Sequence, residues 1–257
     1  MSSGAALKSA VDTPEKLPIS IDPCPIVEVV AEVRFQTSLP TQAIPGVVYA
    51  AISQHFPNMV TLPAASLPEE VGKFNPSLFY QAHYRLEGDR GVVLVGLRHV
   101  GLALKSVPYP GWPSLGNDLK NTLAPIVAAG FITKIERLGL RYINFFEGNV
   151  LPRLALSFVI AGTSVTGIGT TFRAILDEDE CKVLLQIANG MALVNAPERI
   201  GSIIDLDCFA ELPSVTGDLN RSFSVFIENA HIAEKRLFYR LLKPDFLQSL
   251  NPTYDTI

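Results

Sequence analysis

The sequence has little charge, few cysteines and no long apolar run, and each shortage excludes a class of protein. Charged residues make up 18% of the 257 residues, and the net charge is −4. Because no stripe of lysine and arginine is present, nucleic-acid binding is not expected. No apolar run reaches the ~18 residues that a membrane helix needs, and the chain starts without the apolar segment of a signal peptide. The composition therefore predicts a cytoplasmic protein that does not contact membranes.

The three cysteines offer little chemistry. Cys24, Cys181 and Cys208 lie far apart in the sequence, and none belongs to a CxxC pair. An odd number of cysteines with long spacings argues against a disulfide framework and against a zinc ribbon. Cys24 lies between two prolines without a positioned histidine, so it is a poor candidate for a nucleophile.

Motifs of the common catalytic sites are missing as well. The chain has no P-loop, no GxGxxG turn that opens a helix, no GxSxG turn and no HExxH helix. No cofactor is therefore expected, and an enzyme is not the first interpretation. What the chain has in excess is apolar residues, at 48%. Since large apolar surfaces mark association sites, high apolar content with sparse charge favours a protein that binds a partner or a second copy of itself.

The strongest pattern in the chain is the alternation at Lys134–Phe146, KIERLGLRYINFF, which predicts a strand. One face of this strand is apolar and carries Leu138, Leu140, Tyr142 and Phe146. The other face carries Arg137 and Arg141, and two arginines on one face of a strand need carboxylates or a ligand.

Candidate partners for these arginines lie on the first predicted strand, Pro25–Phe35. Its polar face holds Glu28 and Glu32, four residues apart like the two arginines. If the two strands are antiparallel neighbours, each glutamate would lie opposite an arginine. The hypothesis is that Glu28 and Glu32 neutralise Arg137 and Arg141.

The remaining periodicities predict an α+β fold in which helices pack on one face of a mostly antiparallel sheet. Further strands are predicted at 78–86, 92–107, 154–161, 169–177, 182–192 and 202–209, and helices at 41–56, 114–129 and 218–243. Residues 1–23 are small, polar and rich in proline, which predicts a flexible N-terminal arm. Two similar halves are predicted to follow, at 24–150 and 151–257, the second without a first helix and ending in a long amphipathic helix.

Several motifs occur together in a fixed order. They are Pro25-Ile26-Val27-Glu28 with Arg34-Phe35, Tyr109-Pro110-Gly111-Trp112, Arg137-Leu138-Gly139-Leu140-Arg141-Tyr142-Ile143-Asn144, Ile204-Asp205-Leu206-Asp207, and a last helix with His231 and Phe238. With these motifs the chain resembles an uncharacterised protein family with a sporadic distribution in bacteria and archaea. The resemblance covers nearly the whole chain. A patchy distribution resembles that of stress, defence and toxin–antitoxin genes, so it implies a role of that type by association.

Three groups of residues are candidates for chemistry. Asp205 and Asp207 share a strand face about 7 Å apart, where they could hold a divalent cation or form a row of salt bridges. His231 lies at the edge of the apolar stripe of the last helix, where it could move a proton, contact a partner or simply pack beside the core.

The third group is Arg137, Arg141, Tyr142 and Asn144, which could bind an anion. The alternative is that the two arginines are structural, with the glutamates of the first strand as their partners. The leading interpretation is thus a cytosolic interaction protein, acting on another protein or as a homodimer. One alternative is a metal-dependent phosphoester hydrolase that combines Asp205, Asp207, Glu28 and His231. The other is a sensor of a small anionic ligand.

Overall fold

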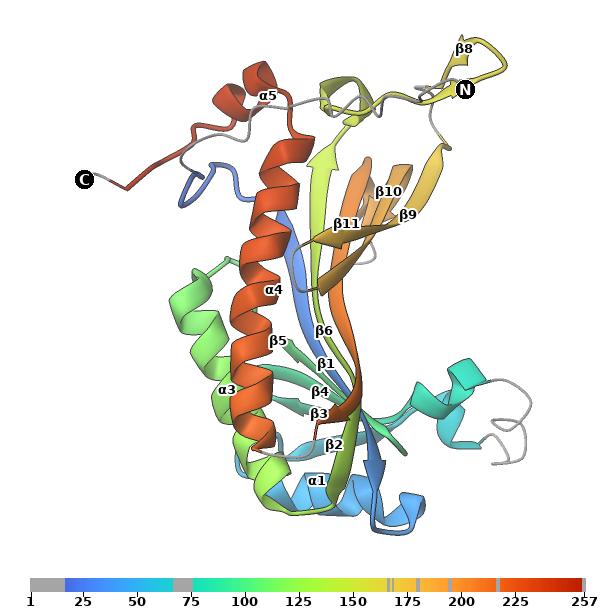
Figure 1. Ribbon diagram of the computed structural model, residues 1–257, viewed down its shortest axis with the longest axis vertical. Helices are drawn as coiled ribbons and strands as arrows, with labels where there is room; N and C mark the ends of the chain where they lie inside the picture. The colour runs from blue at the N-terminus through green and yellow to red at the C-terminus, as the bar shows by residue number, and fades with distance from the viewer. Residues whose placement is uncertain are drawn as a thin grey trace, which may run out of the picture.

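The fold is α+β, with nine strands in one antiparallel sheet and the helices on one side of it (Figure 1). The computed structural model describes residues 17–66, 76–165, 167, 169–178, 181–193, 196–215 and 218–255. The strand order of the large sheet is β2-β3-β4-β5-β1-β6-β11-β10-β9. This confirms the predicted fold class.

The elements of the large sheet and its helices have the following bounds. The strands are β1 (Ile26–Thr37), β2 (Asn58–Thr61), β3 (Ala82–Gly88), β4 (Gly91–Gly96), β5 (His99–Leu104), β6 (Ile132–Glu147), β9 (Thr171–Glu178), β10 (Cys181–Leu193) and β11 (Ala196–Val215). The α-helices are α1 (Ile44–Ile52), α3 (Trp112–Ala128), α4 (Leu219–Leu241) and α5 (Pro244–Ser249). A separate hairpin is formed by β7 (Val159–Ile160) and β8 (Thr163–Ser164), and short 3-10 turns lie at Thr41–Ala43, Pro63–Ser66, Pro76–Tyr80 and Leu151–Arg153.

The sheet is built from two units with the same order of elements. In the first, β1 is followed by α1 and β2, which have no counterpart in the second, and then by the meander β3–β4–β5; β5 pairs back with β1, and helix α3 follows. In the second, β6 is followed by the meander β9–β10–β11, β11 pairs back with β6, and helix α4 follows. Strands β1 and β6 join the units at the centre of one continuous sheet. The first unit therefore ends and the second begins near residue 130, between α3 and β6, and not at the expected position of 150.

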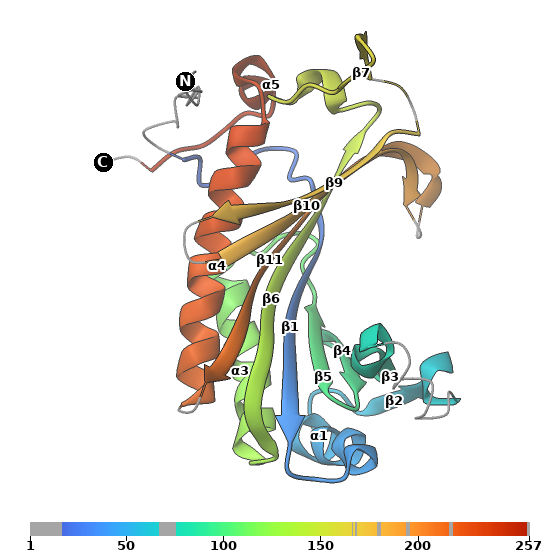
Figure 2. The same cartoon turned by 45° about the vertical axis from the view of Figure 1, so that its right-hand side comes forward.

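The helices cover one face of the sheet because each presents an apolar stripe. Helix α4 packs on β6, β11 and β10 and against α3, while α3 packs on β5 and α1 on β4 and α3 (Figure 2). Helix α4 begins at Asp218, whose side chain accepts a hydrogen bond from the backbone N–H of Arg221 at 3.1 Å. The alternate apolar residues of β1 from Val29 to Phe35 are at most 2% exposed beneath these helices. The core is thus a single layer between sheet and helices.

Two predicted strands differ from the structure. The segment Val92–Val107 is not one strand but two, β4 and β5, with the chain reversing between Gly96 and His99. Its mostly apolar character hid the turn at Leu97-Arg98, because both strands are largely buried. The segment Leu154–Ala161 contributes only the short strand β7, since no neighbour pairs with it over most of its length.

The two ends of the described chain lie against each other. Ser20 forms an isolated bridge with Thr253, and the backbone N–H of Asp22 donates to the carbonyl of Leu250 at 2.8 Å. Ile21 is 7% exposed. Residues 19–22 of the predicted flexible arm are therefore attached to the C-terminal segment, while residues 1–16 lie outside the described residues. In the described ranges, every helix is too short or too polar to span a membrane.

Candidate functional site

Strand β6 separates two very different environments, because its side chains alternate between the open face of the sheet and the face under the helices. Arg137, Gly139 and Arg141 belong to the open face, whereas Leu138, Leu140 and Tyr142 are at most 1% exposed beneath helix α4. The predicted division of this strand into an apolar and a cationic face is confirmed.

On the open face, Arg137 lies between two carboxylates from the neighbouring strands. Its Nη2 donates to Oδ2 of Asp207 on β11 at 2.7 Å, and its Nη1 donates to Oε2 of Glu32 on β1. The guanidinium also stacks over the ring of Phe209, 4.7 Å from its centroid. Gly139 makes this position possible, because a Cβ there would lie 2.7 Å from Nη1 of Arg137.

Arg141 has a different partner from the one expected. Its Nε and Nη2 donate to the two carboxylate oxygens of Asp205 at 2.8 and 2.6 Å, a bidentate pair. These hydrogen bonds raise the pKa of Arg141. Glu28 lies opposite Ile143, and only the long-range field of its carboxylate acts on Arg141.

The predicted register is therefore wrong in detail. Strands β1 and β6 are antiparallel neighbours as expected, but Glu32 lies opposite Gly139 and not opposite an arginine. Arg137 reaches Glu32 diagonally across this glycine. The missed partners were the two aspartates of β11, because nothing in the sequence places that strand beside β6.

The same contacts decide how Asp205 and Asp207 are used. Both carboxylates accept hydrogen bonds from arginines, so they form the row of salt bridges and not a cation site. His231 is on the opposite face of the sheet, where it contacts Tyr142. The four residues of the expected hydrolase do not converge, and within the described ranges no three His, Cys, Asp or Glu side chains are placed to share a metal ion.

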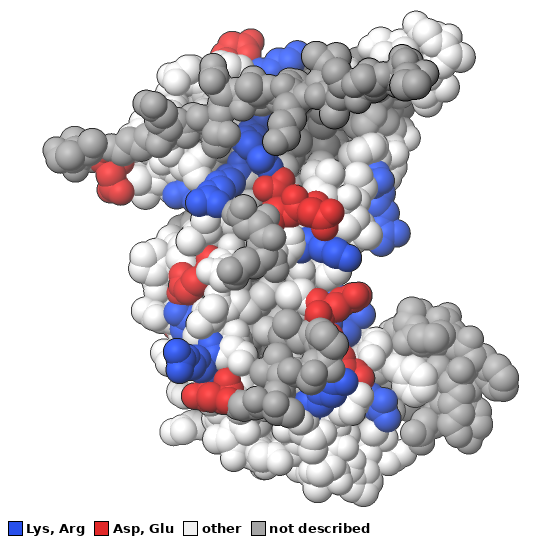
Figure 3. All heavy atoms as spheres, in the orientation of Figure 1, with Lys and Arg blue, Asp and Glu red and all other residues white. Residues whose placement is uncertain are grey.

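The open face is also the hollowed side of the molecule. Figure 3 shows acidic and basic side chains next to one another along the inner edge of this hollow. The interleaving agrees with the pairs formed by Arg137 and Arg141 and with the contact of Arg34 Nε with Glu32 Oε1 at 2.8 Å. A face with its charges matched in this way offers few free groups to an anion.

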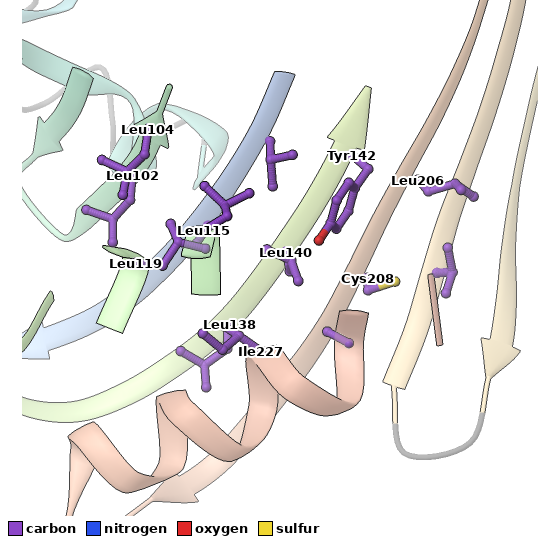
Figure 4. Close-up of a cluster of buried hydrophobic side chains, with 14 of the residues drawn as sticks. Leu102, Leu104, Leu115, Leu119, Leu138, Leu140, Tyr142, Leu206, Cys208 and Ile227 are labelled. Atoms are coloured by element: carbon purple, nitrogen blue, oxygen red, sulfur yellow. The ribbon is translucent and has the colours of Figure 1, made fainter. Parts of the chain in front are cut away.

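The helix-covered face contains a polar group of another kind, centred on Tyr142. Figure 4 shows its ring on β6 in line with Leu138 and Leu140, among the buried apolar side chains. The Tyr142 hydroxyl is hydrogen-bonded to Nδ1 of His231 at 2.9 Å and to the Tyr109 hydroxyl. Burial raises the pKa of Tyr142 well above its ordinary value and raises the pKa of Tyr109 to about 12.

His231 is held in place by a stack. Its ring lies on that of Trp112, with the centroids 4.2 Å apart and the planes 9° apart, and the indole N–H donates to Oε2 of Glu228 at 2.6 Å. The loop Tyr109-Pro110-Gly111-Trp112 presents this indole because Gly111 has φ +85°, a conformation that glycine adopts freely. Burial lowers the pKa of His231 to about 4, with a smaller lowering by the charge of Lys235, so the ring is neutral at neutral pH.

These residues border a cavity of about 420 Å³, which lies between helix α4, strand β6, the loop before α3 and the N-terminal segment. Pockets of this size hold small organic ligands in many proteins. The walls are mostly aromatic and apolar. The residues with side-chain chemistry that border the cavity are Cys24, Tyr109, Trp112, Tyr142, Asn144, His231, Glu234, Lys235 and Tyr239.

Glu234 is the unusual member of this set. It is 6% exposed, and among the described residues no side chain or backbone group forms a hydrogen bond or ion pair with its carboxyl. Burial raises its pKa to about 8, against a smaller lowering by the charge of Lys235. A carboxyl group that is buried without a partner beside a cavity is a candidate for a functional residue.

Sequence reasoning missed Glu234, although a signal was present. Its position is four residues after Ala230 and three before Leu237, which are both buried on the stripe of helix α4. An acid in the middle of an apolar stripe is conspicuous once the stripe is known to be covered. Without knowledge of the cavity, Glu234 has the sequence context of an ordinary charged residue on a helix surface.

The expected anion site is divided between the two faces. Arg137 and Arg141 lie on the open face, whereas Tyr142 and Asn144 border the cavity. Asn144 is 2% exposed, and its Nδ2 donates to the carbonyl of Ile204 at 3.2 Å. The four side chains therefore cannot act on one ligand.

No protein-family model and no curated protein matches the chain.

Proposed function

We propose that the protein binds a small organic molecule in the cavity between α4, β6 and the loop before α3. The observation that carries this proposal is Glu234, a carboxyl group that is 6% exposed and has no hydrogen-bond partner in the described part of the chain. Burying such a group costs several kcal/mol unless something compensates it. A ligand supplies the compensation, and the aromatic walls supply its apolar contacts.

The chain contains its own reporter for this binding. Trp112 is the single tryptophan and borders the cavity, so its fluorescence responds to a ligand there. Cys24 also borders the cavity and is exposed, whereas Cys181 and Cys208 are buried, so a thiol reagent reaches Cys24 first.

The test is a thermal-shift and fluorescence screen with small metabolite-like compounds, combined with native mass spectrometry of the protein as purified. A binding compound is expected to raise the melting temperature, change the fluorescence of Trp112 and slow the alkylation of Cys24, with the variant Cys24→Ser as the control for background labelling. If no compound does so and no ligand is carried through purification, the proposal is wrong.

A second candidate function, homodimer formation, is favoured by the edge strand β9. In the large sheet β9 pairs with β10 alone, and the side chain of Ile175 at its middle is 60% exposed. If a second copy paired antiparallel about Ile175, Arg173 of each chain would lie opposite Asp177 of the other. The edge is therefore complementary to itself in charge.

This second proposal is tested by analytical ultracentrifugation of the native chain and of Ile175→Lys. A lysine in an edge strand opposes pairing between sheets, so the variant is expected to be a monomer at concentrations where the native chain is a dimer. The control is Ile200→Lys, which replaces another isoleucine with 61% exposure on a different strand. A native chain that stays monomeric at high micromolar concentration would refute the dimer.

A further inference from the structure

The chemical class of the ligand can be inferred from what surrounds Glu234. The titratable groups that face its carboxyl are one ammonium, three phenols and one thiol, namely Lys235, Tyr109, Tyr142, Tyr239 and Cys208. Lys235 is the next residue on helix α4, but no ion pair joins it to Glu234. The charge of Lys235 is also attracted by Asp255 of the C-terminal segment. The site therefore holds an acid without a bonded cation.

The walls of the cavity have the chemistry that accompanies a bound cation. Aromatic rings carry negative charge on their faces and attract ammonium groups within about 6 Å of the ring centre. The described lining includes the rings of Tyr109, Trp112, Tyr142, Phe238 and Tyr239. An aromatic enclosure beside one carboxyl group is suited to an organic ammonium ion, and it offers an anion little.

Among the other described groups of the site, the ammonium group of Lys235 is the one that opposes a positive charge, and Asp255 and Glu234 attract it. The ring of His231 is neutral at neutral pH, since burial lowers its pKa to about 4. The amide of Asn144 already donates to a backbone carbonyl at 3.2 Å, and its oxygen is an acceptor. An anionic ligand, in contrast, would meet the Glu234 carboxyl, with Lys235 as the one charged N–H donor in the described lining.

We propose that the cavity binds an organic ammonium ion, with the Glu234 carboxylate as its counter-ion and the tyrosine and tryptophan rings as its walls. This inference rests on the proposed ligand-binding function and narrows it to one class of compound. The cavity of about 420 Å³ is as large as the volume that on the order of a dozen water molecules occupy in the liquid. A bare ammonium ion would not fill it, so the bound ion carries an apolar group as well as its charge.

Binding of such an ion is linked to a proton. The free carboxyl of Glu234 stays protonated up to about pH 8, and the bound ammonium ion requires the carboxylate. Each ion that binds below this pH therefore displaces one proton into solution. The affinity is expected to rise up to tenfold per pH unit between pH 6 and 8 and to level off above that.

The experiment compares ligands that differ only in charge. Three series are built on butyl, benzyl and indolylethyl groups, each as the ammonium ion, the alcohol and the carboxylate. Binding is followed by calorimetry, by protection of Cys24 from alkylation and, for the butyl and benzyl series, by the fluorescence of Trp112. The proteins are the native chain, Glu234→Gln and Glu147→Gln. The last variant is the matched control, because it makes the same substitution at an exposed glutamate that does not border the cavity.

The ammonium member of at least one series is expected to bind the native chain ten times more tightly than its alcohol at pH 8. Glu234→Gln removes this preference, while Glu147→Gln keeps it. If an alcohol or carboxylate binds as tightly as its ammonium partner, or if Glu234→Gln keeps the preference, the ammonium inference is wrong and ligand binding stands. If no compound of any class protects Cys24 or releases heat, and none is found by the wider screen, both proposals fail.

Discussion

The two faces of strand β6 carry their charges in opposite ways. On the open face, Arg137 and Arg141 are bonded to carboxylates of the strands on either side, and the cations and anions balance. On the covered face, Glu234 points its carboxyl toward a cavity with no bonded partner in the described chain. The two faces are separated only by the thickness of one strand.

The difference teaches which charged residues of a fold can serve a function. A buried charge with partners stabilises the arrangement of the strands, and another ligand would have to displace those partners. A buried charge without partners lowers stability, and proteins keep such groups mainly where they act. By this criterion we propose that the covered face is the functional one, although the arginines of the open face dominate the sequence pattern.

The largest expected effect is the pH dependence that Glu234 imposes on stability. The unfolded chain releases this proton near the ordinary pKa of 4.5, whereas the folded chain keeps it to about 8, so stability falls as the pH rises between these values. Relative to Glu234→Gln, the native chain should lose on the order of 4 kcal/mol across this window. Denaturant unfolding at pH 4.5, 6 and 8.5, followed by Trp112 fluorescence, measures the difference. A constant difference at all three values would show that Glu234 ionises normally.

The next largest effect tests whether the charges of the open face are structural. The side chains of Glu32 and Asp207 are 17% and 18% exposed, so Arg137→Ala leaves the mostly buried Asp207 without a bonded cation and leaves Glu32 with Arg34 alone. The free energy of unfolding should fall by about 3 kcal/mol. Adding Asp207→Asn to this variant should recover about 1 kcal/mol, because one unpaired charge is removed.

The opposite result for Arg137 would redirect attention to the open face. If Arg137→Ala keeps native stability but loses binding of an anion, such as a nucleotide, then the arginines form a ligand site after all. Thermal-shift measurements with and without nucleotide distinguish a structural arginine from a binding one.

A smaller effect is expected on the acid side, from His231. The unfolded chain gains a proton near pH 6.5 and the folded chain only near pH 4, so this contribution to stability is complete above 6.5 and is lost as the pH falls toward 4. Relative to His231→Gln, the native chain should lose about 2 to 3 kcal/mol between pH 7 and 4. Other acid-titrating groups are present in both proteins and cancel in the comparison. Equal slopes for the two proteins would contradict a buried neutral imidazole.

The smallest effect sets the scale for the others. Arg199 donates to Glu147 at 2.9 Å, but their side chains are 49% and 70% exposed. Arg199→Ala should change the free energy of unfolding by less than about 0.5 kcal/mol, because water screens exposed pairs. A loss as large as that of Arg137→Ala would mean that burial is not what distinguishes the two ion pairs.

Much of the fold follows from local patterns, because one face of each element is covered. The alternation at 134–146 predicted strand β6 and both of its faces, and the stripe at 218–243 predicted helix α4. Elements buried on both sides were harder to divide, as at Val92–Val107, where only Arg98 and His99 interrupt the apolar residues around the turn between β4 and β5.

The site was predicted less well, since it depends on contacts between distant segments. Pairing of β11 with β6 supplies Asp205 and Asp207 to the arginines, and local sequence does not encode that neighbour. Tyr142 was expected to belong to the anion site together with the arginines, yet its hydroxyl is hydrogen-bonded to His231. Glu234 became visible only when the cavity beside it was known.

Because Ser20 pairs with Thr253, the order in which the two units follow each other along the chain could be exchanged. The described ends lie side by side, and the two topological units meet between Ala128 and Ile132. The chain could therefore be opened at either of these two places without separating elements that belong to one unit. Joining the ends by a linker and reopening the chain near residue 130 would exchange the order of the units and leave every strand neighbour unchanged. The circularly permuted chain should therefore fold to the same sheet and keep the same cavity.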